Sequence, residues 1–254
     1  MKRIVAFAVA LLALLTLAVA PSSAAPATTL ATTSSVVVVK ENGRSFAARV
    51  IQPTGSAPGA YPVIVFGHGF AQSSARYTST LTSWAQRGYV VVAPDSQVGL
   101  LPSHSAFADD LVAAAAWAHR TQPNAALATV LAGHSMGGGA AVLAAARTSG
   151  VTGLVLLAPA ETRPSAVAAA AGVTALSLTV VGSKDTIVPS SQSLSIANAF
   201  AGPDSQYVVE GGFHCGFVDS SSFFGLGCDK GSITRAQQLA ITQSVTGDWL
   251  DANG

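Results

Sequence analysis

Short apolar runs alternate along this chain with segments long enough for helices, and this alternation constrains the fold most strongly. The runs from residue 63 onward are almost continuously apolar, which is typical of parallel strands buried on both faces. The expected strands are residues 36–39, 47–51, 63–66, 89–93, 129–132, 154–157, 176–181 and 207–209, and the expected crossover helices are residues 74–87, 105–120, 137–147, 190–201 and 232–250. The pattern predicts one three-layer α/β domain with right-handed connections.

Two local features refine this prediction. The first two strands are separated by the turn-like sequence ENGRS at residues 41–45, so we expect an antiparallel hairpin at the sheet edge. Near the start of the expected helix at 105–120, Asp109 and Asp110 suit the positive end of a helix dipole. The domain is expected to occupy residues 35–254, without a large inserted lid.

The amino-terminal residues have the layout of a secretory signal peptide. Two cations, Lys2 and Arg3, precede an apolar run and then small residues, which predicts cleavage after Ala24 and a secreted protein. An uncleaved membrane anchor is the alternative, because the apolar run is near the shortest length that spans a bilayer. Residues 25–34 are expected to be a flexible leader, and the mature protein is expected not to insert stably into a membrane.

Charge and cysteine content exclude some partners. Charged residues make up 10% of the chain and the formal net charge is +1, so no basic field is present to attract nucleic acid. Cys215 and Cys228 are expected to form a disulfide in an exported chain, with metal binding by two thiols as the alternative. We expect a monomer with no metal and no cofactor.

Ser135 is the candidate nucleophile. It lies in the sequence Gly133-His134-Ser135-Met136-Gly137, a G-x-S-x-G pattern that follows an expected strand and precedes an expected helix. A sharp turn there holds the serine above the carboxyl ends of the strands, where open α/β sheets bind ligands. The alternative is a glycine-rich turn with an incidental serine.

A serine hydroxyl needs a base and an orienting acid to become a nucleophile. We expect His214 to be the base, because it is the one histidine downstream of Ser135 and follows the last expected strand. A purely structural histidine is the alternative. We expect Asp185 to be the acid, because it lies between the other two in sequence and follows the expected strand at 176–181 by a few residues, at the ligand-binding end of the sheet. The competing carboxylates are Glu161, Asp204 and Asp219.

The other four histidines receive different interpretations. His134 is expected to point away from the site, His119 to lie on the surface, His104 to border a cleft, and His68 to brace the loop that contains it. This account requires Ser135 and His214 to lie within hydrogen-bonding reach of each other.

Two backbone amides are expected to bind the oxyanion of the tetrahedral intermediate. One belongs to Met136, directly after the serine, and the other to Phe70 in the sequence GHGF after the strand at 63–66. A plain strand-to-helix turn is the alternative for that loop. Phe213 and Phe217 are expected to line an apolar cleft with these residues, or equally to be core aromatics.

The chain resembles the secreted bacterial α/β-hydrolases of the cutinase and polyester-hydrolase group, and also the dienelactone-hydrolase-like and chlorophyllase-like lineages. The resemblance covers about residues 61–217, through YPVIVFGHGF, WAQRGYVVVAPDS, DDLVAAAAWAHR, GHSMGGGAAVLAA, LLAPAE, VVGSKDTIVP and GGFHCGF. It implies an α/β-hydrolase fold, with the same nucleophile, acid, base and oxyanion donors. Polyester hydrolases usually have an aromatic residue where Ala160 and Glu161 stand, and commonly tyrosine in place of Phe70.

These features together predict a secreted, cofactor-free serine esterase that acts on small or polymeric carboxylic esters. A catalytically silent binding protein with the same fold is one alternative. An acyltransferase that uses the same acyl-enzyme is the other.

Overall fold

The computed structural model describes residues 29–55, 58–220 and 228–254. The expected signal peptide, residues 1–24, lies outside the described residues. Within them no helix is both long enough and apolar enough to cross a bilayer.

Eight strands form one sheet in the order β1-β2-β4-β3-β5-β6-β7-β8. Their bounds are β1 Thr32–Glu41, β2 Arg44–Pro53, β3 Tyr61–Gly67, β4 Val90–Pro94, β5 Ala125–His134, β6 Val151–Leu157, β7 Leu176–Gly182 and β8 Asp204–Val209. β1 and β2 are antiparallel to their neighbours, whereas β4, β3, β5, β6, β7 and β8 run parallel. The predicted parallel sheet with an antiparallel edge is confirmed.

The edge hairpin turns through Asn42 and Gly43, whose φ angles are 50° and 74°. Positive φ at both central residues is the requirement of the two-residue turn that matches strand twist. β1 begins at Thr32, so the leader prediction was wrong for residues 32–34, which pair with β2. Residues 25–28 of that leader lie outside the described residues.

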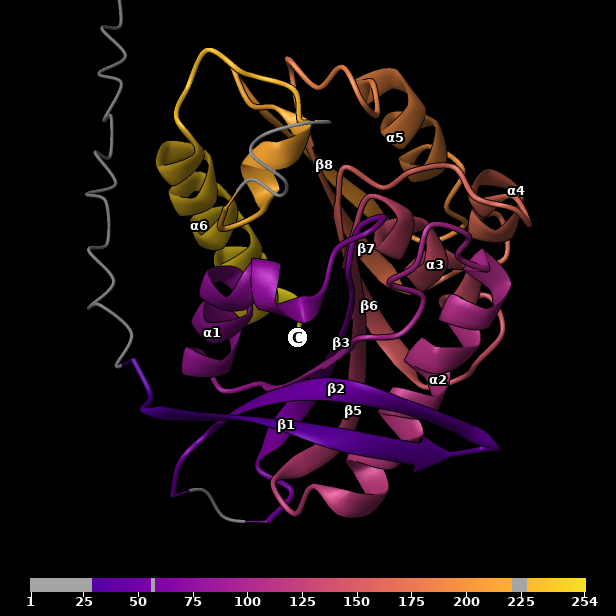
Figure 1. Cartoon of the computed structure of the whole chain (residues 1–254), viewed down its shortest axis with the longest axis vertical. Coiled ribbons are helices and arrows are strands. Elements are labelled where there is room, and N and C mark those ends of the chain that lie inside the picture. Colours follow the sequence, from indigo (N-terminus) through magenta and orange to yellow (C-terminus); the bar gives the residue numbers. More distant parts are fainter. Residues whose placement is uncertain (1–28, 56–57, 221–227) are drawn as a thin grey trace, which may run out of the picture.

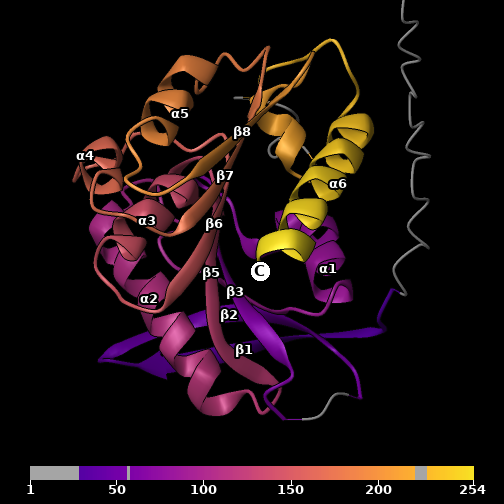
Figure 2. The ribbon, with the colours of Figure 1, turned by 180° about the vertical axis from the view of Figure 1, so that it is seen from behind.

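Helices cover both faces of the sheet. Their bounds are η1 Ser74–Tyr77, α1 Thr78–Gln86, α2 His104–Thr121, α3 Met136–Ala145, α4 Ala166–Ala170, α5 Ser190–Ala197, η2 His214–Phe217 and α6 Arg235–Asn253. α1 and α6 lie on one face, and α2, α3, α4 and α5 lie on the other (Figure 1). The reverse view shows the same three layers (Figure 2). The short elements α4 and η2 were not predicted.

α2 begins at His104, one residue before the predicted start, and its acidic residues lie in its second turn. Its N-cap is Ser103, whose side chain accepts a hydrogen bond from Ala106 N, so Asp109 and Asp110 do not lie in the first turn. The prediction that they serve the helix dipole was wrong. Asp110 is buried and pairs with Arg44, whereas Asp109 accepts a hydrogen bond of 3.0 Å from Arg147.

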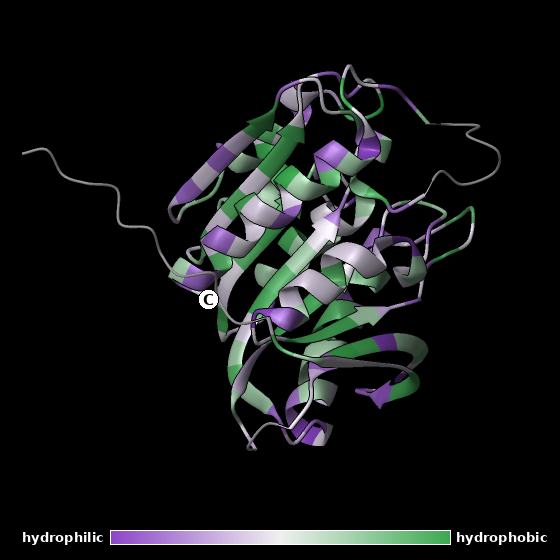
Figure 3. Cartoon of the chain, turned by 90° about the vertical axis from the view of Figure 1, so that its left-hand side faces the viewer, coloured by the Kyte–Doolittle hydropathy of each residue, from purple (hydrophilic) through white to green (hydrophobic). Residues whose placement is uncertain are grey.

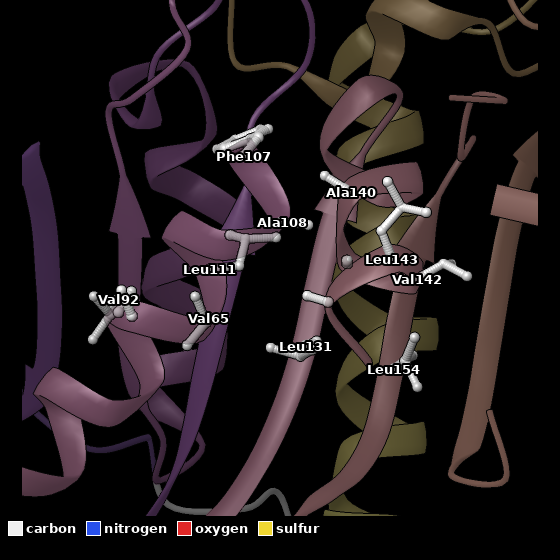
Figure 4. Close-up of a cluster of buried hydrophobic side chains, with 14 of the residues drawn as sticks. Val65, Val92, Phe107, Ala108, Leu111, Leu131, Ala140, Val142, Leu143 and Leu154 are labelled. Carbon is white, nitrogen blue, oxygen red and sulfur yellow. The ribbon is translucent and has the colours of Figure 1, made fainter. Parts of the chain in front are cut away.

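The sheet separates two apolar layers. Figure 3 shows that the central strands are mostly hydrophobic along their length. On one face, side chains of β3, β5 and β6 pack against α2 and α3, and Figure 4 shows Val65, Leu131 and Leu154 among them. On the other face, Trp84 of α1 is fully buried in a second cluster. Because both faces of these strands are buried, their sequences are almost continuously apolar.

Three glycines let α3 approach the sheet closely. A Cβ added to Gly137 would lie 2.1 Å from Gly67 O, and one added to Gly133 would lie 2.4 Å from Gly137 C. No side chain fits at these distances. The turn between β5 and α3 therefore depends on glycine at these positions.

The Gly137→Ala substitution tests this contact. Because the methyl group would overlap the backbone of Gly67, we expect a loss of at least about 3 kcal/mol in the free energy of unfolding. Gly99→Ala is the matched control, since a Cβ there would meet no atom within 4 Å, and it should change stability by less than about 1 kcal/mol. Urea denaturation measures both, and equal effects would contradict the packing account.

Candidate active site

Ser135 occupies the turn between β5 and α3 in a strained backbone conformation. Its φ is 56° and its ψ is −122°, a region that residues with a side chain rarely adopt. Such strain costs about 1–3 kcal/mol and persists only where the surroundings enforce it. The G-x-S-x-G pattern therefore forms the sharp strand-to-helix turn that the sequence predicted.

Hydrogen bonds to the neighbouring strand and loop hold this conformation. Ser135 N donates to Leu157 O at 2.9 Å, and Ser135 O accepts from Ala160 N at 2.9 Å and from Gly139 N at 3.1 Å. The carbonyl thus bonds both the helix and the loop after β6. These contacts fix the serine at the carboxyl end of β5, facing a cavity.

His214 and Asp185 form a buried pair on the adjacent loops. His214 Nδ1 lies 2.7 Å from Asp185 Oδ2, and the two side chains are only 7% and 1% exposed. Asp185 Oδ1 accepts hydrogen bonds from Ile187 N at 3.0 Å and Val188 N at 2.8 Å. Because the carboxylate holds the proton of the ring on Nδ1, Nε2 is left as an acceptor.

The competing carboxylates have other partners. Glu161 accepts hydrogen bonds from Ala166 N at 2.7 Å and Val167 N at 3.2 Å, at the start of α4. Asp219 accepts from Ser79 N at 3.0 Å. Asp204 accepts from Ser177 Oγ at 2.6 Å, and burial raises the pKa of this carboxyl. Among the four carboxylates considered, Asp185 is the one bonded to His214.

The loop after β3 lies directly against the serine. A Cβ added to Gly69 would be 3.5 Å from Ser135 Cβ, and Phe70 lines the cavity. Met136 is the first residue of α3, so its N–H has no acceptor within the helix. Phe70 thus lines the same cavity as Ser135, and Met136 directly follows the serine with its side chain buried in the core. That their amides bind an oxyanion stays a prediction.

His134 belongs to the site, contrary to the prediction that it points away. It lines the cavity, and its ring centroid lies 4.5 Å from that of His214. Tyr77 Oη accepts from Gly69 N at 3.0 Å and lies 2.9 Å from His134 Nδ1. We infer that the buried Tyr77 hydroxyl donates to Nδ1, because its other partner, Gly69 N, is a donor; His134 then carries its own proton on Nε2.

Tyr77 and His134 link the loop after β3 to the serine turn, and no sequence signal identified either one. Burial raises the pKa of Tyr77, so the phenol stays protonated. Burial and, next, the proximity of His214 hold the pKa of His134 well below its ordinary value of 6.5. This histidine is therefore a neutral ring beside the candidate base.

The remaining histidines lie in other surroundings. His68 is fully buried, and its ring nitrogens lie 2.8 Å from Gly69 O and 2.8 Å from Ser96 O, which places it as a brace of its loop. His104 begins α2 and accepts a hydrogen bond of 3.0 Å from Arg163 N. His119 is half-buried and lies 2.8 Å from Thr129 Oγ1, so its placement on the surface was only partly right.

A cavity of about 130 Å³ brings the candidate residues together. It is lined by the sequence-predicted residues Phe70, Ser135 and His214, together with Gly69, Gln72, His134, Ile187, Cys215, Val218 and Cys228. No hydrogen bond joins Ser135 Oγ to His214 within the residues that the structure describes. That the two groups lie within hydrogen-bonding reach therefore stays a prediction.

The two candidate cleft aromatics lie elsewhere. Phe217 is fully buried and Phe213 is 7% exposed, and both pack in the core cluster beneath the site. Their alternative interpretation as core residues describes them correctly. A larger cavity of about 540 Å³ lies away from Ser135, between Leu30 and residues of α1 and α6, and it contains no histidine or serine of the site.

Cys215 and Cys228 form a disulfide, as the sequence predicted. This bridge begins one residue after His214 and forms part of the cavity wall. Among the described residues, no group of three or more histidine, cysteine, aspartate or glutamate side chains is arranged to hold a metal ion.

The lowered pKa of His134 predicts a pH dependence of stability. The unfolded chain binds a proton at this histidine below about pH 6.5 while the native protein does not, so stability falls as pH decreases from 6.5 toward the native pKa. In His134→Gln, this loss should be reduced by up to about 1.4 kcal/mol per pH unit in that window.

Urea unfolding of both proteins from pH 8 to pH 4 measures this effect. At pH 8 the imidazole is neutral in both the native and the unfolded state. The difference in unfolding free energy between the two proteins at that pH therefore measures the effect of the substitution apart from protonation. Identical pH profiles for the two proteins would contradict a buried neutral His134.

Comparisons with known proteins concern the fold of the chain. The family model Hydrolase_4, described as serine aminopeptidase, S33, matches residues 60–178, a little less than half of the chain. No curated protein matches. A dienelactone hydrolase from Anabaena variabilis is 21% identical with a TM-score of 0.66, covering 87% of this chain and 98% of its own.

Two esterase structures are similar as well. Est1E from Butyrivibrio proteoclasticus is 15% identical with a TM-score of 0.65, over 85% of this chain and 99% of its own. A fungal esterase from Rhizomucor miehei is 14% identical with a TM-score of 0.69, over 89% of this chain and 85% of its own. With its mostly parallel eight-stranded sheet flanked by helices, the chain has the α/β-hydrolase fold.

Proposed function

We propose that the chain is a secreted serine esterase that hydrolyses uncharged carboxylic esters through an acyl-enzyme on Ser135. One observation carries this proposal: a strained serine faces the same cavity as a histidine whose Nδ1 is paired with a buried carboxylate. A strained backbone turn and a buried carboxylate both cost stability, and a protein that only binds a ligand has no physical need for them.

The proposed reaction uses the serine hydroxyl, the imidazole and two backbone amides. Ser135 Oγ attacks the carbonyl carbon of the ester while His214 Nε2 takes the hydroxyl proton. The resulting oxyanion accepts hydrogen bonds from the backbone amides of Phe70 and Met136. The intermediate collapses, the alcohol leaves with the proton from His214, and an acyl-enzyme remains. Water, deprotonated by the same histidine, then attacks the acyl carbon and releases the acid.

The cavity favours short acyl groups. Its volume of about 130 Å³ is close to the ~150 Å³ cavity that holds a benzene-sized ligand. The wall includes Phe70, Ile187 and Val218, and the first two are 50% and 44% exposed. An uncharged ester with a short acyl chain fits these surroundings, since none of the described lining residues is aspartate, glutamate, lysine or arginine.

The family match raises peptides as a second class of substrate. An aminopeptidase must bind the positively charged amino terminus of its substrate, which a carboxylate does best. Among the described residues that line the cavity, none is aspartate or glutamate. The lining therefore favours an ester over an amino-terminal peptide.

Secretion and membership in the cutinase and polyester-hydrolase group belong to the same proposal. The disulfide supports export, because disulfides persist in oxidising compartments. The exposed Phe70 at the cavity is compatible with an accessible polymer chain. At Glu161, where polyester hydrolases usually have an aromatic, the side chain is a carboxylate that bonds the backbone at the start of α4.

A panel of p-nitrophenyl esters tests the function. We expect kcat/KM to be highest for acetate to butyrate and to fall for octanoate and palmitate, because the cavity is small. Ser135→Ala should lower kcat/KM for the best ester by about 10⁴- to 10⁶-fold. Ser191→Ala, an exposed serine of α5, is the matched control and should retain wild-type activity.

Two additions to this assay separate the alternatives. Alanine p-nitroanilide reports aminopeptidase activity, and added methanol or glycerol reports acyl transfer through new ester products. No ester hydrolysis by the wild-type protein, or full activity of Ser135→Ala, would exclude the proposed mechanism.

A further inference from the structure

Asp229 bonds both loops of the candidate site. Its Oδ2 accepts hydrogen bonds from His214 N at 2.9 Å and from Thr186 N at 3.1 Å, and its Oδ1 accepts from Cys215 N at 3.1 Å. One oxygen thus joins the segment after β7 to the segment after β8. These two segments carry the carboxylate and the imidazole of the buried pair.

The three amides flank the two paired side chains. Thr186 directly follows Asp185, whose own carboxylate is occupied by two other amides and by the imidazole. Asp185 therefore leaves the Thr186 amide without an acceptor, and Asp229 supplies it. The backbone of His214 is bonded to the same oxygen, so a movement of either loop stretches a hydrogen bond to an ionised acceptor.

The disulfide places this carboxylate. Cys228 directly precedes Asp229 and is bonded covalently to Cys215, whose amide Asp229 accepts. The bridge therefore confines the backbone at residue 229 beside the histidine loop. A role of the bridge in positioning the site follows, in addition to any effect on chain entropy.

Lys184 N donates to Gly212 O at 2.7 Å and Gly211 N donates to Ser183 Oγ at 2.8 Å, so the two loops are also joined near the ends of β7 and β8. Two further anchors of the histidine loop come from α6. Gln238 of α6 is fully buried and bonds both the N–H and the carbonyl of Phe213 at 2.9 Å. Arg235 donates to Cys215 O at 3.2 Å. These two side chains hold the loop against α6, whereas the carboxylate of Asp229 also bonds the residue next to Asp185.

We propose that Asp229 is a positioning residue that sets the geometry of the Asp185–His214 pair relative to Ser135. This inference rests on the proposed esterase function. Asp229 does not touch the reacting atoms. Its carboxylate acts through the backbone, by accepting three amides that an uncharged or displaced group cannot accept together.

Asp229→Asn keeps the size of the side chain but replaces one acceptor oxygen with a donor NH₂, so at least one amide loses its partner. We expect kcat to fall by about 10- to 100-fold with KM changed less than about 2-fold, since small misplacements of a catalytic group carry penalties of this size. Wild-type kinetics in Asp229→Asn would overturn the proposal.

Glu161→Gln is the matched control. Glu161 also accepts two backbone amides, but it does so at α4 and bonds neither paired loop. This variant should keep wild-type kcat and KM while losing a similar amount of stability. An equal fall of kcat in both variants would mean that general destabilisation, and not positioning, explains the effect, and this would also overturn the proposal.

A readout independent of turnover separates this inference from the proposed function. The His214 Nδ1 proton, bonded to Asp185, should give a low-field proton NMR signal that broadens or shifts in Asp229→Asn and stays unchanged in Glu161→Gln. An unchanged signal in Asp229→Asn would contradict the positioning role even if no ester were hydrolysed.

The wild-type protein provides a test that needs no variant to fold. Amide hydrogen exchange should show protection of the Thr186, His214 and Cys215 amides, because all three are bonded to Asp229. Exchange of these amides as fast as that of exposed loop amides would contradict the hydrogen bonds on which the inference rests.

Discussion

The contact between Gly67, Gly133 and Gly137 is the constraint on which the rest of the site depends. Because none of these residues has a side chain, α3 begins directly against the ends of β3 and β5. One residue, Ser135, connects the end of β5 to the start of α3, and its φ is 56°. The strained residue is held by backbone bonds to Leu157 and Ala160. Its hydroxyl is thereby placed at the carboxyl edge of the sheet without any side-chain partner being required to hold it.

Carboxylates around the site share one physical role, which is to accept backbone amides in loops that have no sheet partner. Glu161 does this at α4, and Asp229 does it where the loops after β7 and β8 meet. Asp185 differs because two amides occupy only one of its oxygens, so the other remains for the imidazole. A carboxylate that orients the histidine therefore differs from one that only anchors a loop in the partner of its second oxygen.

Much of the architecture could be predicted from local patterns. Continuous apolar runs identified the parallel strands, and Asn42 with Gly43 identified the hairpin, because both signals depend on residues close in sequence. The order of Ser135, Asp185 and His214 could also be predicted, since each follows a strand whose carboxyl end lies at the same edge of the sheet.

Long-range contacts could not be predicted in this way. His134 was expected to point away from the site, but its ring lines the cavity. The ring lies 2.9 Å from the hydroxyl of Tyr77, which is distant in sequence. Asp229 carries no motif, and its importance comes from a disulfide and from amides on two other loops. The two acidic residues of α2 suggested a helix start, whereas ion pairs with Arg44 and Arg147 explain them. In each case the deciding partner lies far along the chain.

The central claim is that the strained serine is a nucleophile activated by the histidine on the last loop. Covalent labelling with diethyl p-nitrophenyl phosphate, followed by peptide mass spectrometry, tests this claim most directly. The account predicts one diethylphosphoryl group per chain, on Ser135, and a labelling rate that collapses in His214→Gln. Labelling of another residue, no labelling, or labelling unaffected by loss of the imidazole would contradict it.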